Sequence, residues 1–391
     1  MYWPLMKETI TLKDRLKMAK FILTSSKLTN GPKVRQFEEE WSKWVGCDHS
    51  LYVSSGSTAN FLLIAAVKEM YNLKDGDKVL LPACTWMTNV APIFQLGLQP
   101  IFCDVNLENF SFDPEDFDYV RKKHPDIKLI FLTHLLGFYA NRQVVQDAFP
   151  NALILDDVCE SHGVLETDAP DPLSKVGSCG LGATFSFYFG HHMSTIEGGM
   201  VCTNNASLYE LMRMKRSHGL AREASPDRFE LYKKQYKDLN DKFLFITDGY
   251  NFRNHEVCAV LGISQLKRLD QMIAVRRSNY DLFYDYINSR TDKFYLPAYE
   301  GNSNFAFPII TKDRDDAIRV KTILDCNEIE NRPIVSGNLL RHPFLKDYSI
   351  VSPKENMNVD ILHQNGVYVG NSHFVTTENM EKLFALLDAH V

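Results

Sequence analysis

The chain has 391 residues, the length of about two or three ordinary structural units. Hydrophobic residues make up 45% and charged residues 24%, a composition that is ordinary for a globular protein and excludes disordered, collagen-like and coiled-coil chains. The 43 lysines and arginines are outnumbered by 49 aspartates and glutamates, and the net charge of −6 argues against a nucleic-acid-binding protein, which usually carries a basic excess.

The eight cysteines are dispersed, and no two of them form a C-x-x-C pair. This spacing argues against zinc ribbons, dithiol redox chemistry and iron–sulfur clusters, so we expect no metal. The first residues lack the charged start and apolar stretch of a signal peptide, and the longest apolar run, Phe61 to Val67, is far too short to span a membrane. We therefore expect a soluble cytoplasmic protein with reduced thiols and no membrane partner.

Short apolar runs alternate with helical patterns through the first two thirds of the chain. Several runs, such as LILDD and IFLTH, are almost continuously apolar, which is typical of strands buried on both faces. Helices are predicted between the strands, for example over Thr58–Tyr71 and Pro114–Lys123. This alternation predicts an α/β fold with an open, mostly parallel sheet. The predicted strands are Ser50–Ser54, Lys78–Pro82, Gln99–Asp104, Lys128–Thr133, Ala152–Asp156, Ala183–Tyr188 and Met200–Thr203.

The pattern changes near residue 265. We expect residues 1–264 to form a large domain with an N-terminal helical segment, and residues 265–391 to form a smaller α+β domain. The elements predicted after this point are a helical stretch from Ser264 to Ile287, β-like segments at Ala306–Thr311 and Val367–Val369, and a helix at Thr377–Ala389.

Polar groups follow several of the predicted strands, and open α/β sheets bind ligands beyond the carboxyl ends of their strands. The first group, Ser54–Thr58, joins a strand to a helix, and Gly56 with the N–H groups of the helix start could bind an anion. A capped strand–helix turn is the structural alternative. The second group ends an apolar strand with Asp156 and Asp157. A buried carboxylate needs a cation such as a protonated pyridine, whereas a helix cap is again the alternative.

The third group is the loop FGHHMSTIEGG, which lies between two predicted strands and holds His191 and His192. A single histidine is more often structural than catalytic, but two adjacent histidines in a glycine-flanked loop near the other groups favour a functional role. The fourth group, Gly249–Arg253, indicates only a turn when it is taken alone.

Together these groups resemble one family: the sugar aminotransferases that bind pyridoxal 5′-phosphate (PLP) on the aspartate aminotransferase fold, with their dehydratase relatives (the DegT/DnrJ/EryC/StrS family). The resemblance covers most of the chain and implies the PLP-dependent transferase fold of type I, in which helices flank a mostly parallel mixed sheet. Nine blocks occur in the family's order, namely Leu28–Val34 with Phe37 and Glu38, Ser55–Ser57, Pro82–Trp86, Asp104–Val105, Thr133–Gly137, Asp157–Gly163, Ser186–Gly199, Arg216–Gly219 and Gly249–Arg253.

The resemblance implies a set of residues that bind the phosphate of the cofactor. Gly56 and Ser57 would bind it through their backbone N–H groups, and Ser186 would add its hydroxyl. Asn251 would reach the same phosphate from the neighbouring subunit, which implies a homodimer with shared active sites.

The resemblance also implies three residues around the cofactor ring. Asp157 would pair with the pyridine nitrogen and keep it protonated, so that the ring can accept electrons. Trp86 would stack on the ring face. Glu160 would lie near the ring hydroxyl, where relatives often carry glutamine.

One departure from the aminotransferase pattern decides the expected function. In the aminotransferases, the fifth residue after the phosphate-binding serine is a lysine that bonds covalently to the cofactor. Here the fifth residue after Ser186 is His191, and no lysine occurs between Lys175 and Lys215. An imidazole cannot form that bond, but it can remove and return protons. The replacement resembles the sugar 3-dehydratases, which implies that His191 is catalytic and that PLP or pyridoxamine 5′-phosphate is held non-covalently.

The same resemblance implies the substrates. A GDP-4-keto-6-deoxy-D-mannose-type nucleotide sugar would lose its C3 hydroxyl, and L-glutamate would supply the amino group and leave as 2-oxoglutarate, with release of ammonia. The product, GDP-4-keto-3,6-dideoxy-D-mannose, would serve the synthesis of a dideoxysugar such as colitose in O-antigen lipopolysaccharide. Four cationic residues are weaker candidates for binding glutamate or the diphosphate, namely His218, Arg222, Arg253 and Arg332.

Two other functions stay open at this point. A sugar aminotransferase in which another amine replaces the lysine would keep the nitrogen in its product, as a 4-amino sugar. A non-catalytic PLP-binding regulator would be expected to have lost Asp157 or Ser186 as well, and both residues are present.

Overall fold

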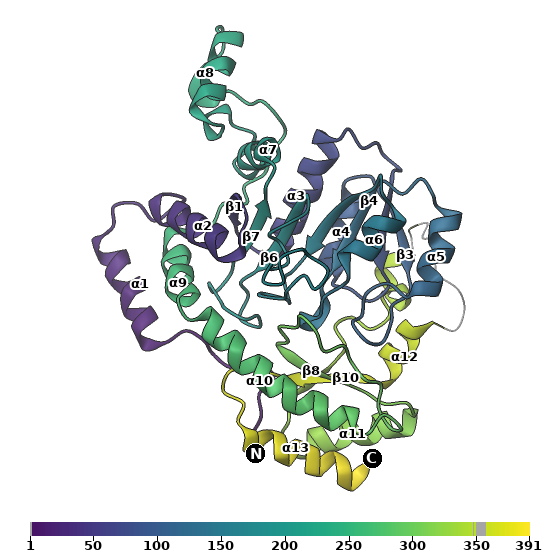
Figure 1. Cartoon of the computed structure of the whole chain (residues 1–391). Coiled ribbons are helices and arrows are strands. Elements are labelled where there is room, and N and C mark those ends of the chain that lie inside the picture. Colours follow the sequence, from purple (N-terminus) through teal and green to yellow (C-terminus); the bar gives the residue numbers. More distant parts are fainter. Residues whose placement is uncertain (1, 347, 349–356) are drawn as a thin grey trace.

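The computed structural model of the chain describes residues 2–346, 348 and 357–391. Figure 1 shows a large sheet in the body of the molecule and a small sheet at its lower end, near which both chain termini lie. Of the helices in these described ranges, none is both long and apolar enough to cross a membrane.

The large sheet has seven strands in the order β1-β7-β6-β5-β4-β2-β3. Strands β2 to β6 run parallel, whereas β7 runs antiparallel to both β6 and β1. Every predicted strand is present within two residues of its expected bounds, so the predicted α/β fold with a mostly parallel mixed sheet is confirmed. The strands are β1 (His49–Val53), β2 (Lys78–Pro82), β3 (Gln99–Cys103), β4 (Leu129–Thr133), β5 (Leu153–Asp157), β6 (Gly182–Ser186) and β7 (Gly199–Thr203).

Helices cover both faces of this sheet, which explains why its strands are apolar on both sides. On β2, Val79 and Leu81 pack with α3 and α4, whereas Leu80 packs with α5 and α6 on the opposite face. The helices around the sheet are α2 (Pro32–Val45), α3 (Gly56–Met70), α4 (Met87–Gln95), α5 (Pro114–Lys123), α6 (Arg142–Ala148), α7 (Ala206–Arg216) and α9 (Glu256–Leu266). Helix α1 (Leu12–Thr24) packs on α9, and α8 (Pro226–Gln235) lies on an arm that projects from the body (Figure 1).

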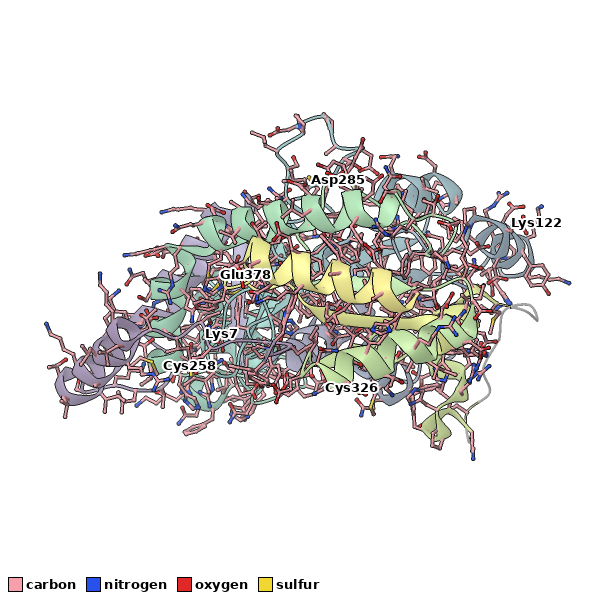
Figure 2. All side chains as sticks on the ribbon, turned by 90° about the horizontal axis from the view of Figure 1, so that it is seen from below. Lys7, Lys122, Cys258, Asp285, Cys326 and Glu378 are labelled. Atoms are coloured by element: carbon pink, nitrogen blue, oxygen red, sulfur yellow. The ribbon has the colours of Figure 1, made fainter. Side chains whose placement is uncertain are left out.

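The small sheet has three antiparallel strands in the order β8-β10-β9. Helices α10, α11 and α13 lie side by side across this end of the molecule, as Figure 2 shows from below. The first residues of the chain also belong here, because Trp3 pairs with Ile329 and its indole N–H donates to the Gly370 carbonyl at 3.0 Å. The elements are β8 (Ala306–Ile310), β9 (Asn331–Pro333), β10 (Gly366–Gly370), α10 (Leu269–Asn288), α11 (Arg314–Cys326), α12 (Asn358–Asn365) and α13 (Thr377–His390).

The single helical stretch predicted from Ser264 to Ile287 is wrong in one respect, because the structure divides it between α9 and α10. Arg268, which lies between the two helices, has a backbone conformation of φ −125°, ψ 4°. Its guanidinium binds the carboxylate of Asp14 in α1 at 2.5 Å. The apolar periodicity continues through this break, so periodicity alone could not reveal a helix end that a contact with α1 stabilises.

Candidate active site

A cavity of about 350 Å³ lies at the carboxyl ends of β4, β5 and β6, beside the start of α3. Open α/β sheets bind their ligands at this edge, and the volume suits a small molecule. A larger hollow of about 530 Å³ beside α2 and α7 contains none of the predicted site residues. The predicted residues that line the first cavity are Gly56, Ser57, Trp86, Asp157, Glu160, Ser186 and His191.

The start of α3 forms one wall of the cavity. Ser55 and Thr58 cap the helix reciprocally: the Thr58 N–H donates to the Ser55 hydroxyl at 3.1 Å, and the Ser55 N–H donates to the Thr58 hydroxyl at 2.9 Å. The N–H groups of Gly56 and Ser57 belong to the first turn, where a helix has no acceptors of its own. A Cβ at position 56 would lie 2.6 Å from the Cβ of Ser186, so only glycine brings the helix this close to that serine. The helix start and the Ser186 hydroxyl can therefore share one anion.

Asp157 is a buried carboxylate, only 4% exposed, at the end of β5. It accepts hydrogen bonds from the Asn60 amide at 3.1 Å and from the Cys159 N–H at 2.8 Å. Among the residues that the structure describes, no lysine or arginine forms an ion pair with it, although its neighbour Asp156 is paired with Arg142. A buried carboxylate without a cation is costly, so a cationic ligand such as a protonated pyridine nitrogen fits this position.

Glu160 is a second acid on the same wall. Its Oε2 accepts the N–H of Leu136 at 2.9 Å, in the turn that follows β4. Burial raises the pKa of Glu160 to about 7, and the nearby charge of Asp157 acts in the same direction. The carboxyl group therefore titrates near neutral pH, and it can donate a hydrogen bond to a ligand oxygen when it is protonated.

His191 reaches the cavity from the loop between β6 and β7. Its Nδ1 is buried and has no hydrogen-bond partner in the described parts of the chain. Burial, and secondly the positive charge of Arg276 in α10, lower the pKa of His191 to about 4. The imidazole is therefore neutral at pH 7 and can accept a proton. Of the described residues that line the cavity, none is a lysine.

Trp86 lies at the rim of the cavity, where it precedes α4 and is 57% exposed. Its exposed indole is available to a flat ligand in the cavity. Tyr188, also at the rim, is 51% exposed.

The other predicted site residues lie outside the cavity. Asn251, Arg253 and His218 form one cluster, in which Arg253 Nε donates to Asn251 Oδ1 at 3.1 Å and Arg253 Nη2 lies 3.3 Å from His218 Nε2. Arg222 donates to the Lys242 carbonyl at 3.2 Å, near the arm that carries α8. Arg332 lies on β9, where its guanidinium donates to the carbonyl of its neighbour Asn331 at 3.0 Å.

Several residues that line the cavity, and Asn60 behind its wall, were not assigned a role from the sequence. Phe305 and Tyr368 come from the second sheet region and Met6 from the start of the chain, and no local pattern links them to the strand ends. Asn60, which holds Asp157, faces β5 from the first turns of α3. His134, by contrast, directly follows β4, so the rule that ligands meet strand ends could have found it.

Residues 10–388 match the DegT/DnrJ/EryC1/StrS aminotransferase family, and the chain belongs to this family. The match confirms the family resemblance stated above.

One relative compared by sequence and two solved structures are similar to this chain over nearly its whole length. The chain is 32% identical to GDP-4-keto-6-deoxy-D-mannose 3-dehydratase of Escherichia coli O55:H7, over 95% of this chain and 96% of that protein. A solved structure of the E. coli dehydratase with bound hydrated PLP matches with a TM-score of 0.86 at 30% identity, covering 99% of each chain. A structure of GDP-4-keto-6-deoxymannose-3-dehydratase with a trapped PLP–glutamate geminal diamine also matches with a TM-score of 0.86 at 30% identity, covering 98% of this chain and all of that one.

Proposed function

We propose that this protein is a PLP-dependent 3-dehydratase, a hydro-lyase, for GDP-4-keto-6-deoxy-D-mannose. L-Glutamate supplies the amino group and leaves as 2-oxoglutarate. The sugar loses its C3 hydroxyl, and ammonia is released together with GDP-4-keto-3,6-dideoxy-D-mannose. The observation that carries this proposal is that a neutral histidine, His191, lines the cavity, whereas none of its described lining residues is a lysine.

The cavity suits the cofactor at four points. The start of α3 and the Ser186 hydroxyl suit the phosphate, and Asp157, which lacks a cation of its own, suits the pyridine nitrogen. Glu160 suits the ring hydroxyl, and the exposed indole of Trp86 would cover one face of the ring. When bound, the cofactor supplies a protonated ring that withdraws electrons from the adjacent carbon.

His191 is the proposed proton-transfer group. Its neutral ring accepts a proton from the carbon that carries the amino group, and the resulting imidazolium gives a proton to the sugar C3 hydroxyl as that group leaves. A lysine in this position would bond to the cofactor, whereas the histidine cannot. The contacts of Gly56, Ser57, Asp157 and Ser186 therefore have to retain the cofactor without a covalent bond.

We further propose that two copies of the chain share their active sites. Asn251 lies outside the cavity of its own chain, in the exposed cluster with Arg253 and His218, which supports a contact with a neighbouring site. Arg222 and Arg332 are weaker candidates for binding glutamate or the diphosphate. Residues 1–264 and 265–391 would act as the large and the small domain, with Phe305 and Tyr368 contributed by the latter to the cavity wall.

The proposed product serves the synthesis of a 3,6-dideoxyhexose such as colitose. We place the enzyme in the cytoplasm, which the eight free cysteine thiols support, since a reducing compartment keeps thiols in this state.

The test is product analysis with the purified protein, PLP, L-glutamate and GDP-4-keto-6-deoxy-D-mannose. We expect equal amounts of 2-oxoglutarate and ammonia, and a dideoxy ketosugar product. Nitrogen retained in the sugar would instead indicate an aminotransferase, and no turnover would indicate a binding protein. Borohydride reduction provides a second check, because a cofactor label found on a lysine would contradict non-covalent binding.

A further inference from the structure

The first residues of the chain are held against the small sheet and lead directly to the cavity. The Trp3 N–H donates to the Glu328 carbonyl at 2.9 Å, and the Trp3 carbonyl accepts from the Glu330 N–H at 2.9 Å. The Leu5 N–H donates to the Glu330 carboxylate, also at 2.9 Å. The side chains of Trp3 and Leu5 are both buried. Met6, which follows them and lines the cavity, therefore has a fixed position in its wall.

The thioether of Met6 lies against Gly190, the residue that precedes His191. A Cβ at position 190 would lie 2.4 Å from both the sulfur and the terminal methyl carbon of Met6, which is closer than real Cβ contacts come. The backbone of Gly190 does not have the positive φ that favours glycine, so a side chain there is opposed by lack of space and not by conformation. Glycine at this position makes room for the thioether beside the proposed proton-transfer group, and both residues line the cavity.

Phe305 extends this apolar surface. It is buried, and its ring centroid lies 6.2 Å from that of His191 and 6.2 Å from that of Tyr368. Met6 packs on the same hydrophobic core as Phe305, and both side chains line the cavity. The part of the cavity near His191 is therefore walled by a thioether and a phenyl ring, whereas the part at the start of α3 offers N–H and hydroxyl groups.

The sugar of the proposed substrate has one apolar substituent, the C6 methyl group on C5. In the proposed reaction, the C3 hydroxyl of this sugar has to reach His191. C3 and C5 are both bonded to C4, the carbon that carries the ketone, so the methyl group lies within the width of one sugar ring of His191. It therefore reaches the part of the cavity where Met6 and Phe305 offer an apolar surface, and burial of a methyl group there is favourable.

A hydroxyl group at C6 would be unfavourable at the same surface. A phenyl ring has no polar atom and a thioether sulfur is only a weak acceptor, so neither replaces the hydrogen bonds that water makes with a hydroxyl. A polar group that is buried without a partner carries a desolvation penalty. Apolar enzyme pockets typically discriminate against an added hydroxyl by up to about 100-fold. The wall formed by Met6 and Phe305 therefore favours a 6-deoxy sugar over its 6-hydroxy counterpart.

We propose that Met6 is a specificity-determining residue, which binds the C6 methyl group of the sugar and disfavours sugars that carry a hydroxyl at C6. Gly190 leaves the room that the thioether occupies, and Phe305 forms the adjoining surface. This inference rests on the proposed function in one respect, namely that the cavity accepts a GDP-linked hexose with C4 near His191. It adds which substituent of that sugar the start of the chain recognises.

The direct test compares the binding of two stable ligands to the full-length protein loaded with pyridoxamine 5′-phosphate. GDP-6-deoxy-D-mannose and GDP-D-mannose differ only in the C6 hydroxyl, and neither has the C4 ketone, so neither reacts. Titration calorimetry gives both Kd values. We expect the 6-deoxy sugar to bind about tenfold more tightly. Equal Kd values for the wild-type protein would overturn the proposal, and this result does not depend on whether any variant folds.

Variants of Met6 test whether this residue is the cause. Met6→Gln keeps the length of the side chain but adds an amide that can bond to a hydroxyl, so the two sugars should bind within about twofold of each other. Met6→Leu stays apolar and should keep most of the tenfold preference. The Kd for GDP alone should not change in either variant. The matched control is Met357→Gln, because Met357 is also partly buried against the same core but is not among the residues that line the cavity.

The outcomes separate this inference from the proposed function. If Met6→Gln binds GDP normally and keeps the tenfold preference, Met6 does not determine specificity. If ammonia is released as expected but the wild-type protein binds both sugars equally, the inference fails and the proposed function stands. If no ammonia is released but the preference exists and is lost in Met6→Gln, the proposed function fails and the recognition of the methyl group stands.

Discussion

Asp156 and Asp157 are adjacent residues at the end of β5, and they point to opposite faces of the sheet. Asp156 meets Arg142 of α6 in an ion pair and lies 3.2 Å from Nε2 of His134. Within the described parts of the chain, Asp157 accepts hydrogen bonds only from neutral donors, the amide of Asn60 and the Cys159 N–H. Both carboxylates are buried, with 0% and 4% of their surface exposed.

We propose that this difference separates a structural acid, Asp156, from a ligand-binding one, Asp157. Removing a carboxylate from water is strongly unfavourable unless a cation compensates it. On the α6 face, the chain supplies that cation itself. On the α3 face, none of the described residues supplies a cation, and the same face holds Glu160, whose pKa is raised by burial and secondarily by the charge of Asp157. Four predictions test this contrast, beginning with the largest expected effect.

Asp157→Asn should lower turnover about 1000-fold, which corresponds to about 4 kcal/mol in the barrier, because an amide cannot keep a pyridine nitrogen protonated. The unfolding free energy of the cofactor-free protein should stay the same or rise, since an uncompensated buried charge is removed. Steady-state kinetics and urea unfolding measure the two effects. A variant that is strongly destabilised but fully active would reverse the assignment.

Asp156→Asn should have the opposite profile. It leaves Arg142 buried without its partner, and breaking a buried ion pair typically costs about 3–5 kcal/mol. Urea unfolding of the cofactor-free protein measures this loss. The double variant Asp156→Leu with Arg142→Met serves as the control, because it removes both charges and should be more stable than Asp156→Asn.

Glu160→Gln should change how stability depends on pH. Burial raises the pKa of Glu160 from an ordinary 4.5 to about 7, so between these pH values the folded protein binds more protons than the unfolded chain, and this residue lowers stability as pH rises. Glutamine does not titrate. The variant should therefore be more stable than wild type at pH 8 by up to about 3 kcal/mol, with no gain at pH 4. Urea unfolding at both pH values measures this, and an equal difference at both would contradict the cause.

Gly56→Ala should have the smallest effect. Its new Cβ would meet Ser186 at 2.6 Å and push the start of α3 away from that hydroxyl. We expect the Kd for pyridoxamine 5′-phosphate to rise about tenfold, or about 1.4 kcal/mol, with a similar change for inorganic phosphate. Titration calorimetry measures both ligands. Ala59→Ser, in the same helix but outside the residues that line the cavity, serves as the control.

Much of the fold was predictable because local patterns encode it. All seven strands of the large sheet were located from short apolar runs, several of them almost continuously apolar because both faces of the strand are buried. The residues of the candidate site could be collected as well, since polar groups that follow parallel strands end at the same edge. The break between α9 and α10 was missed because the contact of Arg268 with Asp14 joins segments 254 residues apart.

The sequence by itself determined that strand ends carry Gly56, Asp157, Ser186 and His191, and that no lysine is near enough in the chain to replace the histidine. Only the tertiary structure decided which of two neighbouring aspartates is neutralised by Arg142 and which faces a cavity. Packing likewise surrounded His162 with aromatic rings and placed it near His191 and His192. The physical reason is that charge compensation and burial depend on contacts between distant segments, whereas periodicity and strand-end position are local properties of the chain.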